Sequence, residues 1–188
     1  DTLSAYMRVV EEALPRVFLL ENVEGLAYSN KNEGLRHLLD HVRRINKKTH
    51  SNYLASYQVI RAADYGVPQV RGRFFMIASR DGRGFCFPAP THGAPLDPTG
   101  QQLELTSLEP FRTAWDALAD VCPDPGEDLA PKGKWADLLP SIPEGQNYLW
   151  HTDRGGGQPL FGWRRRYWSF LLKLAKDRPS WTVQAQPG

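Results

Sequence analysis

Large apolar side chains recur at helical spacing at the start of the chain. They are Leu3, Met7, Val10 and Leu14. Spacings of three and four residues predict an amphipathic helix, and Pro15 marks its end because proline cannot continue the helical hydrogen bonding. A continuous apolar run follows at residues 17–20, and its Val and Phe members favour a strand that is buried on both faces.

The apolar run ends in two polar side chains, Glu21 and Asn22, at the carboxyl end of the predicted strand. After a loop at residues 24–34, apolar positions again recur at helical spacing through residues 35–45, with basic residues on the opposite face. Helix, strand and helix in this order predict an α/β fold. Ligands collect at the carboxyl ends of strands in open α/β sheets, so Glu21 is a candidate functional residue, although a glutamate there can also be structural.

Two further strands are predicted at residues 52–60 and 74–78, joined by the Gly- and Pro-containing connection "DYGVPQVRGR". Beyond residue 88 the pattern changes, because prolines and glycines are frequent and periodic runs are scarce. A helix is expected near residues 113–121. The rest of this part of the chain should consist mainly of loops.

Composition narrows the possible functions. With 188 residues and 41% hydrophobic residues, the chain can form a core, and no apolar run reaches the roughly 18 residues that a membrane helix needs. Cys86 and Cys122 lack metal-ligand spacing, so we expect two buried thiols and no structural zinc. We expect a soluble cytoplasmic protein, associated with the nucleoid. The net charge is only +2, but residues 154–178 carry seven basic side chains and one acidic.

Two segments carry a resemblance to a known family. The segments "PRVFLLENVEGL" and "YQVIRAADYGVPQVRGRFFMIASR" resemble, in order and spacing, the E-N-V and Q-x-R-x-R blocks of the cytosine-5 DNA methyltransferases. "TAWDALADV" is similar to a helix that follows the arginine block in bacterial members. "PSWTVQAQPG" resembles the sequence just before the family's penultimate block.

The resemblance implies roles for five polar residues. In this family a cysteine thiolate attacks carbon 6 of cytosine, while the glutamate that matches Glu21 hydrogen-bonds ring nitrogen 3 and the exocyclic amine. Burial behind the apolar strand should favour the neutral, proton-donating form of Glu21. Arg73 would contact the 2-oxo group and Arg71 would brace the active-site loop. Asn22 and Gln69 would position backbone.

Such an enzyme must flip its cytosine out of duplex DNA, so a region that grips the DNA is also expected. The segment at residues 146–176 suits that role, because glycines permit close approach to a groove and arginines bind phosphate and guanine. The alternative is a glycine hairpin beside a solvated basic strand. The candidate DNA-binding residues are Arg154, Gly155, Gly156, Gly157, Arg164, Arg165, Arg166 and Tyr167.

The Pro-Cys-Gln loop with the family's nucleophile and the glycine-rich turn that holds S-adenosylmethionine do not occur in this sequence. We therefore expect an internal part of the enzyme that is inactive alone. Its fold would be the C-terminal half of a Rossmann-like methyltransferase sheet at residues 1–87, plus a loop-rich target-recognition region at residues 88–188. Without its neighbouring strand, the segment at residues 17–23 would be an unpaired apolar edge through which the isolated chain self-associates.

Two other functions stay open. One is a non-catalytic DNA-binding subunit, or half of a split methyltransferase whose partner chain brings the cysteine. The other is methylation of RNA cytosine, which is disfavoured because the Cys-Phe-Thr signature expected in that branch of the family does not occur. The leading interpretation is a DNA (cytosine-5-)-methyltransferase that uses S-adenosylmethionine on duplex DNA, in the setting of a restriction-modification system.

Overall fold

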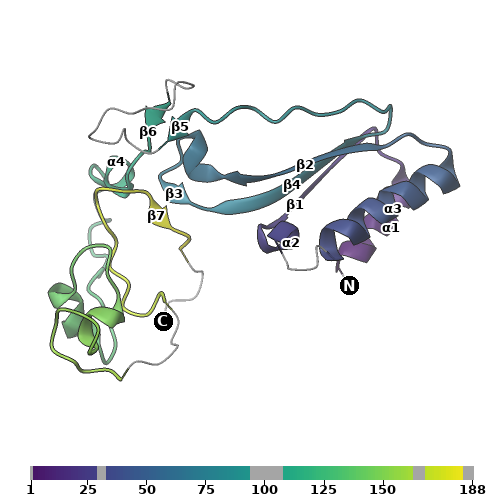
Figure 1. The fold of residues 1–188 in the computed structure, drawn as a ribbon. Helices are drawn as coiled ribbons and strands as arrows, with labels where there is room; N and C mark the ends of the chain where they lie inside the picture. Colours follow the sequence, from purple (N-terminus) through teal and green to yellow (C-terminus); the bar gives the residue numbers. More distant parts are fainter. Residues whose placement is uncertain (1, 29–32, 94–107, 163–167, 184–188) are drawn as a thin grey trace, which may run out of the picture. The chain divides into compact units, whose positions relative to one another are not determined.

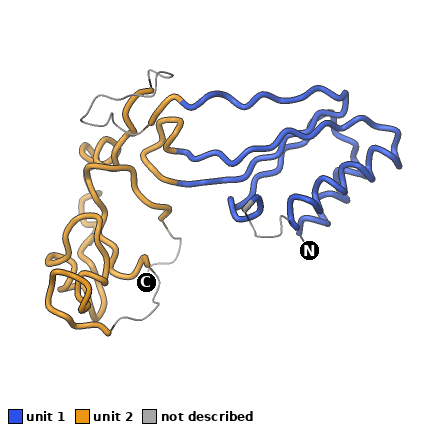
Figure 2. The backbone as a smooth tube through the Cα atoms, viewed as in Figure 1, with its two compact units in different colours: residues 1–62, 71–90 blue, residues 63–70, 91–188 orange. Residues whose placement is uncertain are grey.

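The computed structural model describes residues 2–28, 33–93, 108–162 and 168–183, and its architecture is mixed α/β (Figure 1). The contacts divide the chain into two compact units (Figure 2). Unit 1 comprises residues 1–62 and 71–90, and unit 2 comprises residues 63–70 and 91–188. In the described part of the chain, no helix is long and apolar enough to cross a membrane.

Unit 1 contains a three-stranded sheet in the order β1-β4-β2. The central strand β4 (Gly72–Ser79) is antiparallel to both β1 (Val17–Val23) and β2 (Leu54–Arg61), so β1 and β2 run in the same direction. Val23 pairs with Arg73, and Arg61 pairs with Gly72. The carboxyl ends of β1 and β2 therefore meet the beginning of β4 at one end of the sheet.

Helices α1 (Thr2–Ala13) and α3 (Glu33–Thr49) cover one face of this sheet (Figure 1). The apolar stripes of both helices face the strand residues that alternate toward them, as the 3.6-residue and 2-residue periods require. The result is a single apolar core. It consists of Met7, Val10, Phe18, Leu20, Leu38, Val42, Ile45, Tyr53, Phe74, Met76 and Ala78.

The other face of β1 is open, and the expectation of a strand buried on both faces is wrong. Phe18 and Leu20 are buried, but Val17, Leu19 and Val23 are 54%, 54% and 59% exposed. The physical reason is that α1 and α3 both pack on the same face, and no described helix covers the opposite one. Periodicity alone could not show this, because a continuous apolar run looks the same whether one or both faces are covered.

β1 is at the edge of the sheet, as expected from the sequence, and it pairs along its whole length with β4 on one side. Its other side makes no strand pairing within the described residues. There the Tyr6 hydroxyl donates a hydrogen bond of 2.7 Å to the Leu19 carbonyl oxygen. β1 is thus an edge strand with one open side.

The segment predicted as a loop at residues 24–34 contains a short helix, α2 (Gly25–Tyr28). The connection between β2 and β4 likewise contains a one-turn 3₁₀ helix, η1 (Ala62–Tyr65), and the two-residue strand β3 (Gln69–Val70). Single turns of this kind carry too few residues to show a hydrophobic period.

The described residues of unit 2 form little regular structure. β3 pairs in parallel with β7 (Ser180–Trp181), and β5 (His92–Gly93) pairs in parallel with β6 (Glu109–Pro110). Two further 3₁₀ helices are present, η2 (Ala136–Ser141) and η3 (Tyr148–His151).

The helix expected at residues 113–121 is observed as α4 (Ala114–Leu118), which is shorter than predicted. Its start is well specified, because Thr113 and Asp116 form a capping box in which each side chain accepts a hydrogen bond from the other residue's backbone N–H. It ends at Leu118, and the backbone N–H of the C-cap residue Ala119 donates to the Trp115 carbonyl oxygen.

The two cysteines are not buried as expected. Cys86 and Cys122 are both exposed free thiols. Cys86 follows the end of β4 in an extended segment, where the Phe85 N–H donates to Ser56 Oγ at 2.9 Å, and Cys122 lies in the loop after α4. Neither segment belongs to the core of unit 1.

Candidate functional site

Glu21 and Arg73 lie together at the end of the sheet where β1 and β2 finish. Both side chains are on the face opposite α1 and α3, because they alternate with the core residues Leu20 and Phe74. Glu21 pairs with Phe75, so Arg73 is its diagonal neighbour, within reach of a long side chain. Arg73 Nε lies 2.9 Å from Glu21 Oε1.

The surroundings of the pair are wetter than the sequence suggested. The Glu21 side chain is 46% exposed and the Arg73 side chain 21%. The expectation that the strand holds Glu21 in a dry environment is therefore wrong for this chain, because Glu21 projects from the uncovered face of β1. The charged partner at hydrogen-bond distance, rather than burial, is the main feature of its environment.

Arg73 keeps donors for a further partner. A guanidinium has five N–H groups. Nη1 donates to the Gly72 carbonyl oxygen at 2.7 Å and Nε faces Glu21. Within the described residues these contacts use two N–H groups, so three can serve an acceptor presented at this end of the sheet.

Asn22 contacts backbone through its side chain, whereas Gln69 and Arg71 make the contacts described here through their own backbone groups. Asn22 Oδ1 accepts from the N–H of Val23 at 2.8 Å, and the Arg71 carbonyl accepts from the N–H of Ala62 at 3.0 Å. Gln69 belongs to unit 2, where it pairs with Ser180 in the β3–β7 ladder. The segment "PSWTVQAQPG" is thus connected to the arginine block through backbone hydrogen bonds.

Sequence reasoning missed Gly72 and Glu24. A Cβ added at Gly72 would lie 1.8 Å from Glu24 Oε2, so the Glu24 side chain lies directly over the backbone between the two arginines. A glycine inside a strand often marks such a close approach, and this signal could have identified the position.

The glycines proposed to approach DNA make a close approach inside unit 2. A Cβ on Gly155 would lie 2.2 Å from the Trp150 carbonyl oxygen, and one on Gly157 would lie 2.6 Å from Trp150 Nε1. Arg154 is exposed, and its backbone N–H donates to Thr152 Oγ1 at 3.3 Å. The other candidate contacts lie outside the described residues: Arg164, Arg165, Arg166 and Tyr167.

The described residues do not fit a metal or a dinucleotide-like cofactor at this end of the sheet. Among them, no group of three or more His, Cys, Asp or Glu is placed to hold a metal ion. Neither strand that ends here leads into a glycine-rich turn, because Glu24 alone separates β1 from α2 and β2 passes directly into η1. What the site presents is a carboxylate and a guanidinium, which suits a planar polar ligand with both donors and acceptors.

Comparison with known proteins gives the family context. Residues 1–114 match the family model for C-5 cytosine-specific DNA methylase. The chain is 44% identical over 188 residues to type II methyltransferase M.SacI of Streptomyces achromogenes, covering 99% of this chain and 46% of that protein.

Two other relatives are also type II methyltransferases that are about twice as long as the part matched by this chain. Type II methyltransferase M.AquIA of Picosynechococcus sp. is 39% identical over 63% of this chain and 48% of that protein. Type II methyltransferase M.NgoFVII of Neisseria gonorrhoeae is 30% identical over 98% of this chain and 46% of that protein. The chain spans about half the length of these relatives.

Proposed function

Because the chain belongs to the C-5 cytosine-specific DNA methylase family, we propose that it is the cytosine-binding part of a DNA (cytosine-5-)-methyltransferase. The complete enzyme would transfer a methyl group from S-adenosylmethionine to carbon 5 of a flipped-out cytosine in duplex DNA. The names of the relatives further support a restriction-modification setting. The observation that carries the proposal is the pairing of Glu21 with Arg73 at the carboxyl end of β1.

The chemistry of this pair matches the edge of a cytosine base. Cytosine presents an acceptor at the 2-oxo group, an acceptor at ring nitrogen 3 and a donor at the exocyclic amine. A protonated glutamic acid offers one donor and one acceptor, which suits nitrogen 3 and the amine. The spare N–H groups of Arg73 suit the 2-oxo group. Together the two side chains would draw electron density from the ring and make carbon 6 a better electrophile.

A bound base would also change the environment of Glu21. The flipped cytosine would lie over the open face of β1, and would replace water around a carboxyl group that is half-exposed in this chain. We propose that Glu21 reaches the dry environment needed for its neutral, proton-donating form only when the base is bound. Arg71, whose backbone is anchored to Ala62, would brace the loop beside the base.

Residues 1–87 would supply the C-terminal half of a Rossmann-like catalytic sheet, and residues 88–188 most of the target-recognition region. Arg154, with the Gly155, Gly156 and Gly157 turn beside it, would contact the DNA. We assign the nucleophilic cysteine and the S-adenosylmethionine site to parts of the enzyme outside this chain, because neither Cys86 nor Cys122 has the Pro-Cys-Gln context.

The test is Glu21→Ala in the complete enzyme. Turnover should fall by at least about a hundredfold, because a positioned acid contributes that much, while affinity for duplex DNA should change little. Glu12→Ala removes an exposed glutamate from α1 and is the matched control. A Glu21→Ala enzyme with near wild-type turnover would disprove the proposed role.

The 188-residue chain alone should incorporate no methyl groups into DNA. This is tested with labelled S-adenosylmethionine and unmethylated duplex DNA. Incorporation by the purified chain would place the nucleophile within it and would overturn the assignment of that group elsewhere.

A further inference from the structure

A basic groove between α1 and α3 takes no part in the proposed methyl transfer. Its volume is about 570 Å³, and Ser4, Arg8 and Glu11 line it from α1. The helices pack on the face of the sheet that carries Phe18 and Leu20, whereas Glu21 and Arg73 project from the opposite face. The groove is therefore separate from the proposed base site.

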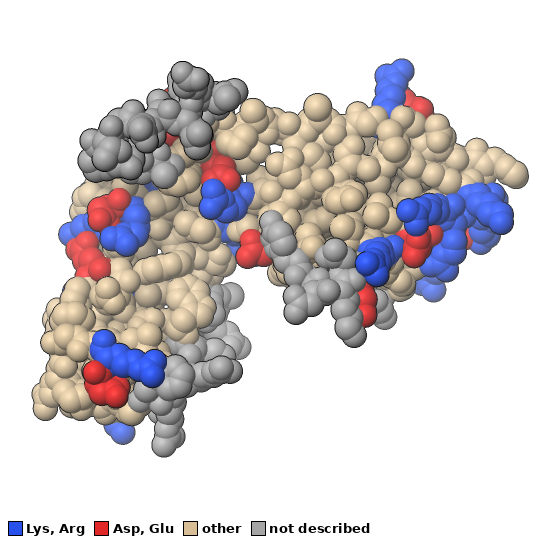
Figure 3. Space-filling model, in the orientation of Figure 1, with Lys and Arg blue, Asp and Glu red and all other residues tan. Residues whose placement is uncertain are grey.

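The groove carries an excess of positive charge. Arg8 comes from α1 and three cationic residues come from α3: Arg44, Lys47 and Lys48. Glu11 is the one acidic residue in the lining, so the formal excess is three positive charges. Lys and Arg gather over this part of unit 1, with acidic side chains among them (Figure 3).

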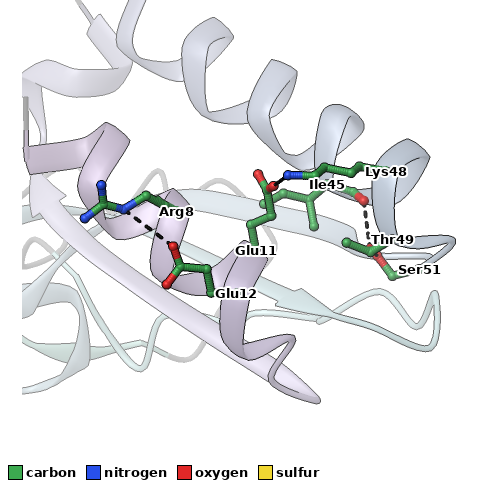
Figure 4. Close-up of polar contacts among 7 residues, drawn as sticks. All are labelled: Arg8, Glu11, Glu12, Ile45, Lys48, Thr49 and Ser51. Carbon is green, nitrogen blue, oxygen red and sulfur yellow. Dashed lines mark hydrogen bonds and ion pairs between the residues drawn. The ribbon is translucent and has the colours of Figure 1, made fainter.

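Two of these cations have an ion-pair partner and two have none in the described structure. Lys48 pairs with Glu11, and Arg8 lies 3.7 Å from Glu12 (Figure 4). The Arg8–Glu12 pair is mostly exposed on both sides, so it is weak and easily exchanged for another anion. Among the described residues, no ion pair involves the two remaining cations, Arg44 and Lys47.

Helix electrostatics explain only part of this arrangement. Lys47 and Lys48 lie in the last turn of α3, where basic side chains interact favourably with the negative end of the helix dipole. Arg44 precedes that turn, and Arg8 lies in the middle of a different helix. Their convergence on one concave surface is not required by either helix and indicates a binding site for an anion.

We propose that the α1–α3 groove binds phosphate groups, either of a nucleic-acid backbone or of a free polyphosphate. Guanidinium groups bind phosphate oxygens through paired N–H donors, and lysines add point charges. The cations are spread along two helices, which suits a ligand with several linked phosphates better than a single small anion. DNA bound here would lie on the opposite face of unit 1 from the base at Glu21.

The experiment uses the 188-residue chain and inorganic triphosphate as the probe, measured by isothermal titration calorimetry. The test variant is Arg44→Gln with Lys47→Gln. The control is Arg36→Gln with Arg43→Gln, which removes the same charge from exposed positions of the same helix outside the groove. We expect the test variant to weaken triphosphate binding about tenfold or more, and the control about twofold or less.

A second arm identifies the source of the phosphate. Labelled duplex DNA is titrated with both variants, and its binding should be steeply salt-dependent. Competition with triphosphate and selective weakening by Arg44→Gln with Lys47→Gln would assign a nucleic-acid backbone. A DNA affinity that ignores these substitutions, with triphosphate binding still dependent on them, would assign a free polyphosphate.

Two outcomes would overturn the proposal. They are no triphosphate binding and equal weakening by the two double variants. If the test variant misfolds, amide NMR shifts of the wild-type chain decide the question. Triphosphate must then perturb Arg8, Arg44 and Lys47 in preference to Arg36 and Arg43.

Discussion

Units 1 and 2 differ in the kind of side chain that they bury. Every buried residue described in unit 1 belongs to one apolar cluster between a sheet and two helices. Among its described residues, unit 2 buries three polar side chains, His92, His151 and Thr152, beside scattered apolar groups that include Ile142 and Tyr148. His151 shows how: its Nδ1 donates to the Gln158 carbonyl at 2.9 Å, and its Nε2 lies 2.9 Å from Ser141 Oγ.

This difference separates two ways of holding a functional residue. In unit 1, packing fixes the strands and the strands fix Glu21 and Arg73 relative to each other. In unit 2, loops are held by hydrogen bonds among themselves and by aromatic contacts. The N–H groups of Leu160 and Phe161 both donate to the His151 carbonyl at 2.9 Å, and the Phe161 ring contacts the Tyr148 ring at a centroid distance of 6.2 Å. We expect the base-binding groups to be placed by the rigid unit and the DNA contacts by the adaptable one.

The largest effect should come from Phe74→Ala. Phe74 is fully buried in the unit 1 core, and its truncation should lower the free energy of unfolding by about 3–5 kcal/mol. All six tryptophans belong to unit 2, so tryptophan fluorescence reports on unit 2, while far-UV circular dichroism is dominated by α1 and α3. In urea, the dichroism midpoint should shift strongly and the fluorescence midpoint little. Equal shifts would show that the units unfold as one.

Gly155→Ala should have the opposite effect, because it should destabilise unit 2 and leave unit 1 unchanged. The added methyl would lie 2.2 Å from the Trp150 carbonyl oxygen and 2.4 Å from that of Leu149, and backbone atoms cannot yield as a flexible side chain does. The cost should be about 1–3 kcal/mol, visible in tryptophan fluorescence and not in the helical dichroism signal.

Gly162→Ala is the control for Gly155→Ala, because a Cβ at Gly162 would meet no atom within 4 Å. Its effect should stay within about 0.5 kcal/mol. If Gly155→Ala lowers DNA affinity while leaving the stability of unit 2 unchanged, the glycine acts at the DNA and the packing explanation is wrong.

The contrast between the units also explains how far the sequence could be interpreted. The helices around Met7 and Leu38 were predicted well, because their apolar stripes are long and periodic. Unit 2 offers no such period, since its strands have two residues and its helices are mostly single 3₁₀ turns. The exposure of Cys86 and Cys122 could not be predicted for the same reason, because loop positions carry no burial signal.

The candidate site shows the same limit on a smaller scale. The position of Glu21 at a strand end followed from the apolar run before it, and the family resemblance linked it to Arg73. Their contact depends on β4 being inserted between β1 and β2 in antiparallel orientation, and no local pattern encodes that order. The half-exposure of Glu21 depends on which face the helices cover, which is also a tertiary property.

A smaller effect is expected at the open side of β1. The N–H of Arg80 donates to the carbonyl oxygen of Arg16, the residue opposite it. Backbone groups alternate in direction along a strand, so the N–H and C=O groups of the even-numbered residues of β1 face β4. Those of the odd-numbered residues, including Leu19, face the open side. The isolated chain should therefore self-associate through Val17–Val23. Leu19→Lys should weaken association about fivefold, corresponding to about 1 kcal/mol for a half-exposed leucine, as followed by light scattering. Exposed strand edges associate at concentrations of about micromolar and above. Wild-type protein that stays monomeric at about tens of micromolar would therefore contradict the predicted self-association.

The smallest effect should be a loss of the stability of unit 1 at alkaline pH. Burial raises the pKa of the Tyr6 hydroxyl, and it raises the pKa of Tyr53 although Arg80 opposes the shift. A raised pKa in the folded state means that these groups stabilise the fold fully below their ordinary pKa of about 10, and that this contribution is lost as the pH rises through the folded-state value.

The double variant Tyr6→Phe with Tyr53→Phe should therefore flatten the loss of stability above about pH 10 in the dichroism signal. Tyr57→Phe, at a half-exposed position on β2, is the control and should retain the wild-type slope. If the double variant loses stability just as steeply as the wild type, the alkaline transition arises elsewhere, and the hydroxyl that caps the Leu19 carbonyl has no measurable part in it.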